Sequence, residues 1–449
     1  MLVAAHDAFH PETASTAPKD AASAVRFEGE RGMVSAAQGA VGAPAVNPLG
    51  QRRAMIASGF GWGLDAFDFY LYVYGLPAIL TTFGLTAAAG GLLATYTLVF
   101  SAIGGIVMGA LADRIGRKRT LMISIAWYAV FTFLSGVAQN YPQLAVFRAL
   151  EGLGFGGEWA VGSVLMSEWA TASRRGRALG FVQGSWAIGW LAANIAFQIV
   201  VATVGPNPGW RYLFFLGILP ALFVLYIRRN VDDPPVYQAT RRTSTGTSSL
   251  AGIFAPGIAR TTFFASLLAI GVQSGYYALF TWMPTYLTKQ RHIPPFTSGW
   301  YLYLLIAGSY IGYVSAGFIN DALGRKRTFV LFSLCSAAMV PLYLYTVAAD
   351  WQLVIAGPLL GFFASGIFSG FGPYLSELYP SAVRGAGQGF CYNLGRGVAG
   401  IGPFAIGWLS AHFAIGTAMT VVAVFAYLLA VLAVAFLPET RGKELAPEG

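Results

Sequence analysis

Charged residues are scarce in this chain. Asp, Glu, Lys and Arg make up 10% of its 449 residues, whereas hydrophobic residues make up 56%. Soluble proteins carry roughly 25% charged residues, so the composition argues against a large soluble core. The hydrophobic residues come in long blocks, and a block of about 18 or more apolar residues with few charges is typical of a membrane-spanning helix.

Cysteine and histidine are also rare, which argues against metal and redox chemistry. Cys335 and Cys391 lie inside apolar blocks, at a spacing that suits neither a metal site nor a disulfide framework. We interpret them as small buried hydrophobic residues. The Gly-rich run "GLGFGG" lacks the βαβ context of a nucleotide loop, and Walker, metal-cluster and catalytic-triad patterns are absent. We therefore expect no metal, no cofactor and no enzymatic activity.

The beginning of the chain lacks any sustained apolar run. Residues 1–53 are rich in Ala, Pro, Gly, Ser and Thr and carry scattered charge, a composition that predicts a disordered tail. They do not show the charged, apolar and cleavage regions of a signal peptide in order. We expect the apolar block that begins near Ala54 to be the first membrane span.

Twelve apolar segments follow this tail. Each is expected to be helical, because backbone groups in lipid must satisfy one another. The predicted helices cover residues 54–80, 89–112, 120–139, 142–166, 178–203, 210–228, 260–287, 298–322, 328–348, 351–376, 385–409 and 414–437. The polar stretch between the sixth and seventh cannot span a membrane. The predicted organisation is a tail at 1–53, a six-helix bundle at 54–228, a linker at 229–259, a second six-helix bundle at 260–437 and a tail at 438–449.

Positive charge is concentrated at alternate helix ends. Most Lys and Arg fall on the side that receives both tails, whereas only Arg211, Lys289 and Arg291 fall in the loops of the other side. The positive-inside rule then places both termini in the cytoplasm. Topology thus accounts for the formal net charge of +9. We expect a multi-pass monomer in an inner (plasma) membrane, with a lipid bilayer rather than nucleic acid as its surroundings.

The sequence repeats itself at an offset of about 208 residues. The segment "GALADRIGRKRT" from Gly109 matches "GFINDALGRKRT" from Gly317, and "SEWATASRRGRALG" from Ser167 matches "SELYPSAVRGAGQG" from Ser376. Repeats of this kind, related by an axis along the membrane normal, place a substrate site between the two halves near the midplane.

These motifs carry a family resemblance. "GALADRIGRKR" resembles the signature between the second and third spans of the major facilitator superfamily, and "RALEGLG" resembles its fourth-span motif. "LDAFDF" is similar to the paired-acid first span of organic-acid proton symporters. "GFGGEW", "DDPPVY" and "LPETRGKEL" are most similar to the sialate and monocarboxylate symporter branch, although "PETRG" is also similar to the tail motif of sugar porters. The resemblance implies an all-α membrane fold of twelve helices in two pseudo-symmetric halves.

Ionisable residues inside the predicted spans are the candidates for function, because each costs about 2.5–3.5 kcal/mol to insert. Asp65 and Asp68 lie at i, i+3 on one helix face, and two close carboxylates in a low dielectric resist double ionisation. This favours a proton-binding site. Alternatively, the two acids cap a break in the first helix or pair with Arg148.

The fourth predicted helix carries three ionisable residues on one face, Arg148, Glu151 and Glu158. Arg148 can pair with Glu151 one turn away, and protonation of Glu151 would then release the arginine; the resemblance also implies proton coupling at Arg148. A permanent structural ion pair is the alternative. Glu158 has no cation in its own helix, and we interpret it as a proton carrier that is neutral or reaches another span.

Arg396 lies inside the eleventh predicted span, and no acid shares the membrane interior of the second half with it. A guanidinium suits bidentate binding of a carboxylate, so we predict that Arg396 binds the substrate carboxylate; pairing with Asp65 or Asp68 across the cavity is the alternative. Polar neutral residues are expected to complete the substrate site, although each also suits an interhelical hydrogen bond. They are Gln183, Asn194, Gln273, Tyr276 and Asn393.

The two copies of the loop motif are predicted to gate rather than to bind. Charge clusters at these helix ends would latch the halves together when the cavity opens outward; the alternative is that they only set the topology. The residues are Gly109, Asp113, Arg114, Gly116 and Arg117 in the first copy, and Asp321, Gly324 and Arg325 in the second.

The sequence therefore predicts a transporter that couples a proton to a small organic anion, such as sialate, lactate or an aromatic acid, by alternating access. A sugar porter and a proton-coupled drug exporter are alternatives with the same fold. A non-transporting membrane sensor is an alternative of a different class.

Overall fold

The computed structural model describes residues 48–169, 175–233, 250–346, 350–380 and 383–442. These residues are almost entirely helical and contain no strand. The first half of the described chain consists of α2 (Pro48–Phe83), α3 (Ala87–Ile115), α4 (Arg117–Val137), α5 (Tyr141–Trp169), α6 (Arg175–Val204), and a divided helix formed by α7 (Pro206–Leu216) and α8 (Leu219–Asn230).

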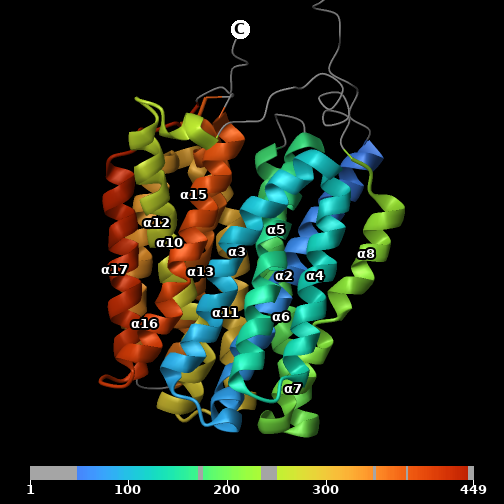
Figure 1. Cartoon of the computed structure of the whole chain (residues 1–449). Helices are drawn as coiled ribbons and strands as arrows, with labels where there is room; N and C mark the ends of the chain where they lie inside the picture. The colour runs from blue at the N-terminus through green and yellow to red at the C-terminus, as the bar shows by residue number, and fades with distance from the viewer. Residues whose placement is uncertain (1–47, 170–174, 234–249, 347–349, 381–382, 443–449) are drawn as a thin grey trace, which may run out of the picture. The chain divides into compact units, whose positions relative to one another are not determined.

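The second half repeats this plan with more interruptions (Figure 1). Its elements are the short 3-10 helix η2 (Leu250–Phe254), α10 (Ala259–Thr285) with the π-helical turn η3 (Tyr286–Gln290), α11 (Pro295–Leu323), α12 (Arg325–Pro341) with the π-helical turn η4 (Leu342–Thr346), α13 (Asp350–Gly366) with η5 (Ile367–Gly370) and α14 (Phe371–Leu378), α15 (Arg384–Ala399) with α16 (Ile401–Leu409), and α17 (Ile415–Ala435). The described residues thus form twelve helical segments, as predicted.

Nine of these segments, within the described residues, are long and apolar enough to cross a membrane by length and composition. The three that do not meet this criterion are α2, α5 and the pair α15–α16. These are also the helices that carry the ionisable residues predicted to function. The charges and glycines that reduce their hydropathy therefore mark the helices from which a site is built.

The observed helix ends differ from the predicted ends by a few residues, with two corrections. Residues 48–53, predicted as part of a tail, form the first turns of α2, and residues 250–254 of the predicted linker form η2. Residues 1–47, 234–249 and 443–449 of the predicted tails and linker lie outside the described chain. The division into two domains stays a prediction.

The helix breaks, which the sequence analysis did not predict, follow residues that weaken a helix. Gly400 separates α15 from α16, and Pro403 in the new helix has no N–H to continue the hydrogen-bond pattern of the old one. Pro220 has the same effect at the start of α8, after Gly217. Such breaks let one membrane span change direction without losing its apolar length.

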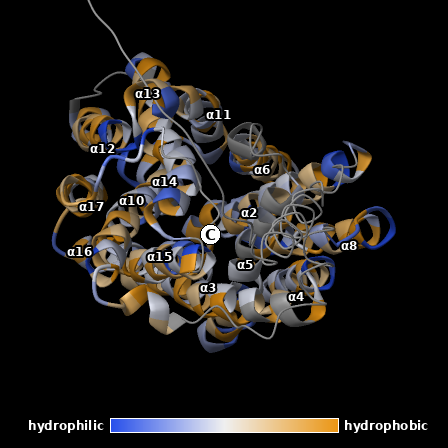
Figure 2. Ribbon diagram, turned by 90° about the horizontal axis from the view of Figure 1, so that it is seen from above, coloured by the Kyte–Doolittle hydropathy of each residue, from blue (hydrophilic) through white to orange (hydrophobic). Residues whose placement is uncertain are grey.

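The two halves meet along several helix contacts, among them α6 with α11 and α3 with α15 and α16. Figure 2, which looks along the helices, shows α6 beside α11 and α3 beside α15. The Thr95 hydroxyl donates to the Gly400 carbonyl at 2.5 Å, and the Asn194 amide donates to the Gly299 carbonyl at 2.9 Å. All described helices belong to one compact unit. These hydrogen bonds hold the two halves of the chain in direct contact.

Large hydrophobic side chains cover the outer surfaces of the helices. Phe425 of α17, Phe318 of α11 and Leu222 of α8 are each more than 60% exposed, and Figure 2 shows the hydrophobic residues on the outward sides of α16 and α17. An exposed apolar surface of this extent suits contact with lipid. The start of α2 and the end of α17 lie at the same end of the bundle in Figure 1, which we call the tail end.

Candidate functional site

All six ionisable residues predicted inside the spans are buried within the bundle. Each side chain is at most 1% exposed, and both halves contribute to the set. The residues are Asp65 and Asp68 from α2, Arg148, Glu151 and Glu158 from α5, and Arg396 from α15. None of them faces outward. A charge at such a position needs a partner or a ligand, because no water replaces its lost hydration.

Three of these residues form what we call the Arg148 cluster: Asp68, Arg148 and Glu151. Arg148 and Glu151 form a fully buried ion pair one helical turn apart, which confirms the predicted pairing. Asp68 interacts with both of them, and the Arg148 guanidinium lies 4.5 Å from the centre of the Tyr72 ring. The cluster joins α2 to α5. Its role in proton coupling stays a prediction.

The other three residues, Asp65, Glu158 and Arg396, form the Arg396 cluster. The guanidinium of Arg396 lies within electrostatic reach of both carboxylates, so Glu158 does reach a cation of another helix. However, Arg396 forms no ion pair and no hydrogen bond with any of the described residues, although the side chains of Tyr277 and Tyr392 interact with it. A buried guanidinium without a charged acceptor is suited to bind an anion.

Aromatic rings enclose the unpaired guanidinium. The Arg396 Cζ lies 5.2 Å from the ring centre of Phe155, 5.4 Å from that of Tyr392 and 5.5 Å from that of Trp62. Cation–π contacts of this kind stabilise a charge without occupying its hydrogen-bond donors. Arg396 is thereby held in place while its N–H groups stay available.

The spacing of residues along α2 and α5 explains why the acids lie beside this guanidinium. Trp62 precedes Asp65 by three residues and Phe155 precedes Glu158 by three, so each ring shares a helix face with an acid. The Glu158 carboxylate also rests directly against Gly61, where a side chain would collide with it. Helix periodicity and a missing side chain therefore bring Glu158 close to α2.

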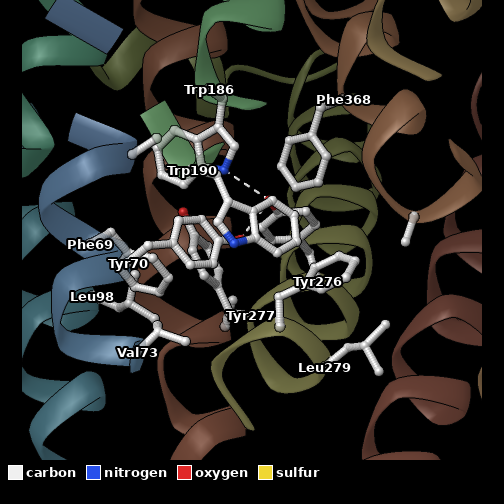
Figure 3. Close-up of a cluster of buried hydrophobic side chains, with 14 of the residues drawn as sticks. Phe69, Tyr70, Val73, Leu98, Trp186, Trp190, Tyr276, Tyr277, Leu279 and Phe368 are labelled. Carbon is white, nitrogen blue, oxygen red and sulfur yellow. Dashed lines mark hydrogen bonds between the residues drawn. The ribbon is translucent and has the colours of Figure 1, made fainter. Parts of the chain in front are cut away.

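An aromatic cluster continues from the Arg396 cluster toward the contact of α6 with α10. It consists of Tyr70, Trp186, Trp190 and Tyr276 (Figure 3). The rings of Tyr70 and Trp190 stack with centres 4.3 Å apart and planes 5° apart. The Trp186 indole donates to the Tyr276 hydroxyl at 2.8 Å, and the Tyr276 and Tyr70 hydroxyls lie 3.1 Å apart. The two rings therefore cover each other's facing surfaces, and the cluster joins α2 to α6 and α10.

The structure separates the predicted polar substrate residues into two groups. Tyr276 belongs to the aromatic cluster. Gln183 interacts with the side chain of Tyr392, and Gln273 donates to the Tyr392 carbonyl at 2.8 Å. Tyr392 precedes Arg396 by one turn of α15. Gln183, Gln273 and Tyr276 thus lie near the candidate site.

The other two predicted polar residues serve contacts between helices. Asn194 donates to the Gly299 carbonyl where α6 meets α11, and Asn393 donates to the Gly389 carbonyl at 3.0 Å while packing against Gly105 of α3. The Asn194 contact matches the alternative that the sequence left open, an interhelical hydrogen bond, whereas the Asn393 hydrogen bond stays within α15. Substrate binding by either residue stays a prediction.

Both copies of the loop motif end in a glycine of unusual conformation. Gly116 has a φ of 104° before α4, and Gly324 has a φ of 96° before α12, values that other residues rarely adopt. Asp233 accepts from the Lys118 N–H at 2.9 Å, and Glu439 accepts from the Arg325 and Lys326 N–H groups at 2.9 and 3.1 Å. The acids of "DDPPVY" and "LPETRGKEL" therefore stabilise the first turns of α4 and α12.

The charged residues of the second motif copy form ion pairs at the end of the bundle. Arg325 pairs with Asp321 at 2.8 Å and with Glu377 of α14 at 3.0 Å. Both contacts lie within the second half of the chain.

In the first motif copy, Arg117 donates to the Ala112 carbonyl at 3.0 Å, and among the described residues no other element comes within 4 Å of the position that a side chain at Gly109 would take. The side chains of Asp113 and Arg114 lie outside the described part of the structure. A gating role for either motif copy stays a prediction.

The sequence analysis missed the residues of α4 and most of the aromatic residues of the site. Tyr128 and Thr132 of α4 interact with the acids of α2, and Trp62, Phe155 and Tyr70 enclose the site. The rings could not be singled out because aromatic residues make up 15% of the chain. Tyr128 and Thr132 did have a signal: they are polar residues one turn apart on a largely apolar helix.

Known proteins resemble this chain over most of its length. The family model described as Major Facilitator Superfamily matches residues 58–315 and 290–449. A probable 4-methylmuconolactone transporter from Cupriavidus pinatubonensis is 40% identical over 87% of this chain and 91% of its own. A cis,cis-muconate transport protein from Acinetobacter baylyi is 32% identical over 84% and 92%, respectively.

A sialic acid transporter, NanX, from Escherichia coli is 28% identical over 87% of this chain and 95% of its own. Among solved structures, the proton:xylose symporter XylE bound to 6-bromo-6-deoxy-D-glucose superposes with a TM-score of 0.70 and 20% sequence identity, over 88% of this chain and 98% of that one. This likeness concerns the fold alone.

Proposed function

Because this chain belongs to the Major Facilitator Superfamily, we propose that it carries a small organic anion together with a proton across a bacterial inner membrane by alternating access. The family and the named relatives identify a multi-pass membrane transporter of small organic substrates rather than an enzyme. The anion, the proton and the direction of transport are the proposed part.

The observation that carries the proposal is the unpaired Arg396. This residue is fully buried, lies where α15 meets the helices of the first half, and keeps all its N–H donors free of the described residues. A substrate carboxylate would accept two parallel hydrogen bonds from the guanidinium. In the proposed complex it also adds a negative charge beside Asp65 and Glu158, which favours protonation of one of them. Anion binding and proton binding would thereby reinforce each other.

A named relative favours planar, unsaturated acids among the possible anions. The Acinetobacter baylyi relative is named for cis,cis-muconate, a substrate that is conjugated and flat. Aromatic rings also surround the Arg396 cluster, where the ring centres of Phe69 and Phe155 lie 6.1 Å apart. We therefore rank an aromatic or dienoic acid above sialate and lactate.

The two rival transport functions fit the site less well. A sugar is neutral and would leave the donors of Arg396 without a charged acceptor. A cationic drug would be repelled by the same guanidinium. The likeness to XylE supports the fold and not a sugar substrate, because only 20% of the residues are identical.

Uptake by purified protein in proteoliposomes tests the proposal. The external solution is made acidic, and uptake of nicotinate, cis,cis-muconate, sialate and lactate is measured with and without the pH gradient. We expect the gradient to stimulate uptake of a planar acid. Uptake that is the same with and without the gradient would remove the proton from the proposal.

An arginine-to-lysine substitution tests the anion site. Arg396→Lys keeps the charge but loses the bidentate geometry, so we expect a loss of roughly tenfold or more in uptake, equivalent to one charged hydrogen bond of about 1.5–3 kcal/mol. Arg260→Lys, an exposed arginine at the start of α10, is the matched control and should transport normally. Normal uptake by Arg396→Lys would exclude its substrate role.

A further inference from the structure

Helix α4 carries a row of hydroxyl side chains directed into the bundle. Ser124, Tyr128 and Thr132 follow one another at intervals of four residues, and all three are fully buried. This spacing places them on one face of α4, the face that packs against α5. The Ser124 hydroxyl donates to the Gly154 carbonyl of α5 at 2.6 Å. The hydroxyls of Tyr128 and Thr132, in contrast, form no hydrogen bond with any described residue.

The Tyr128 side chain lies among three of the buried acids. It interacts most directly with Asp65 and lies within electrostatic reach of Asp68 on the same helix and of Glu158 on α5. Tyr128 thus interacts with acids of both clusters: Asp65 and Glu158 belong to the Arg396 cluster, and Asp68 belongs to the Arg148 cluster.

Thr132 extends this contact by one turn. Its side chain interacts with Asp68, and it does not donate to the carbonyl four residues earlier, as buried serine and threonine residues in helices commonly do. Ser135 of the same helix does form that bond, to the Phe131 carbonyl at 3.0 Å. The Thr132 hydroxyl is thus left available to the acid.

The directions of the helices explain why the hydroxyls of α4 lie level with the acids of α2 and α5. Successive helices alternate in direction, so α2 and α4 run the same way and α5 runs the opposite way. The step from Asp65 to Asp68 then parallels the step from Tyr128 to Thr132. Along α5, Glu158 comes level with Asp65 and Glu151 with Asp68. The hydroxyls of α4 accordingly lie alongside both clusters.

Resting on the proton coupling proposed above, we propose that Tyr128 relays a proton between Asp65 and Asp68, and so links the Arg396 cluster to the Arg148 cluster. In this step the Tyr128 oxygen accepts the proton of the Asp65 carboxyl group while its own O–H proton passes to the Asp68 carboxylate. One O–H bond forms and one breaks at the phenol oxygen, and the tyrosine stays neutral. Reversal of the step returns the proton.

A hydroxyl group can connect the two carboxylates, which form no hydrogen bond with one another. The Tyr128 hydroxyl forms none with them in this structure either, so the relay requires these side chains to rotate toward one another. A hydroxyl group both accepts and donates a hydrogen bond, whereas the surrounding aliphatic and aromatic side chains do neither. The relay would let a proton bound beside the substrate reach the ion pair of α5, whose breaking frees Arg148.

The test compares two kinds of transport in proteoliposomes that contain the Tyr128→Phe variant. Net uptake driven by a pH gradient requires the proton to move through the protein, but exchange of labelled for unlabelled substrate at equal pH does not require net proton transfer. We expect Tyr128→Phe to slow gradient-driven uptake by about tenfold or more, in line with the loss of a proton-transfer group, and to leave exchange within about twofold of the wild type. Thr132→Val should slow the same step.

Tyr427→Phe is the matched control. Tyr427 of α17 is also fully buried and its hydroxyl also forms no hydrogen bond with the described residues, but the neighbour of this hydroxyl is Ser336 rather than an acid. The control should retain both kinds of transport. Comparison of the two variants separates the loss of a relay from the general effect of removing a buried hydroxyl.

Each outcome decides between the claims. Gradient-driven uptake by Tyr128→Phe at the wild-type rate would overturn the relay, and so would equal loss of uptake and exchange, because that result indicates a structural role. Loss of uptake with exchange retained would support it. If the wild type itself transports anions without any dependence on the pH gradient, the proposed function fails first and the relay with it.

Discussion

The contact of Glu158 with Gly61 yields a prediction in which stability and transport respond differently. An alanine Cβ at position 61 would overlap the Glu158 carboxylate oxygen Oε1 and lie 3.2 Å from the carboxylate carbon. The carboxylate is the flexible end of a long side chain, so it can swing away, at a cost of about 0.5–1.5 kcal/mol for a strained rotamer. Replacing glycine by alanine inside a helix returns about 0.8–1.0 kcal/mol. The net change in unfolding free energy for Gly61→Ala should therefore stay within about 1 kcal/mol.

Transport should change far more than stability does. A displaced Glu158 carboxylate no longer rests between α2 and the guanidinium of Arg396, so the proposed proton site loses one of its two acids. We expect gradient-driven uptake by Gly61→Ala to fall by about tenfold or more, as for the loss of a positioned acid–base group. Thermal unfolding in detergent and uptake in proteoliposomes measure the two effects on the same preparation.

Two further variants make the reasoning refutable. Gly75→Ala lies on the same helix, but its Cβ would meet the Trp210 side chain at an ordinary contact of 3.4 Å, so both stability and uptake should be retained or slightly improved. Shortening the acid in the double variant Gly61→Ala, Glu158→Asp should make room and restore part of the uptake. Wild-type uptake by Gly61→Ala, or no recovery in the double variant, would show that the carboxylate does not act from this position.

Two other predictions concern stability. Removing one partner of the buried pair, by Arg148→Met or Glu151→Gln, should lower the unfolding free energy by about 3–5 kcal/mol. The double variant should lose less than the sum of the two single losses. Thermal unfolding of the three variants checks this, and additive losses would contradict the pairing. At the tail end, partial burial opposes ionisation of Glu439, but four backbone N–H groups stabilise its carboxylate and lower the pKa of Glu439 below its ordinary value. The carboxylate should then stabilise the fold fully above about pH 4.3, the ordinary pKa of glutamate, and lose this effect as the pH falls through the lowered pKa. In Glu439→Gln, the melting temperature should therefore fall less steeply with decreasing pH than in the wild type. The same pH dependence in both proteins would exclude this contribution.

The fold was predictable because membrane insertion leaves few options. Long apolar segments must be helical, and the repeat of the loop motif defines two halves, so the number and order of the helices followed from the sequence. The helix breaks did not follow. A glycine such as Gly400 is tolerated inside many membrane helices, and whether the helix bends there depends on what packs against it.

The charged part of the site was predictable for a related reason. A charge such as Arg396 or Glu158 is costly in an apolar span, so its presence alone indicates a function or a partner. The pairing of Arg148 with Glu151 followed from one helical turn. The position of Arg396 among rings from the other half did not follow, because that contact depends on how α15 packs against α2 and α5.

The hydroxyl row of α4 could not be predicted from the free energy of inserting side chains into a membrane. Tyr128 and Thr132 cost little to bury compared with a charge, and α4 is apolar enough to pass as an ordinary membrane span, whereas α2, α5 and α15 are not. Composition therefore identifies the helices that hold charge but not the one that connects the charges. What distinguishes Tyr128 is that its hydroxyl, unlike that of Ser124 one turn away, has no backbone acceptor and lies beside acids of both clusters. A buried hydroxyl that interacts with acids of both clusters can accept and donate a proton, and for that reason the Tyr128→Phe variant tests more of the proposed mechanism than another substitution of a charge would.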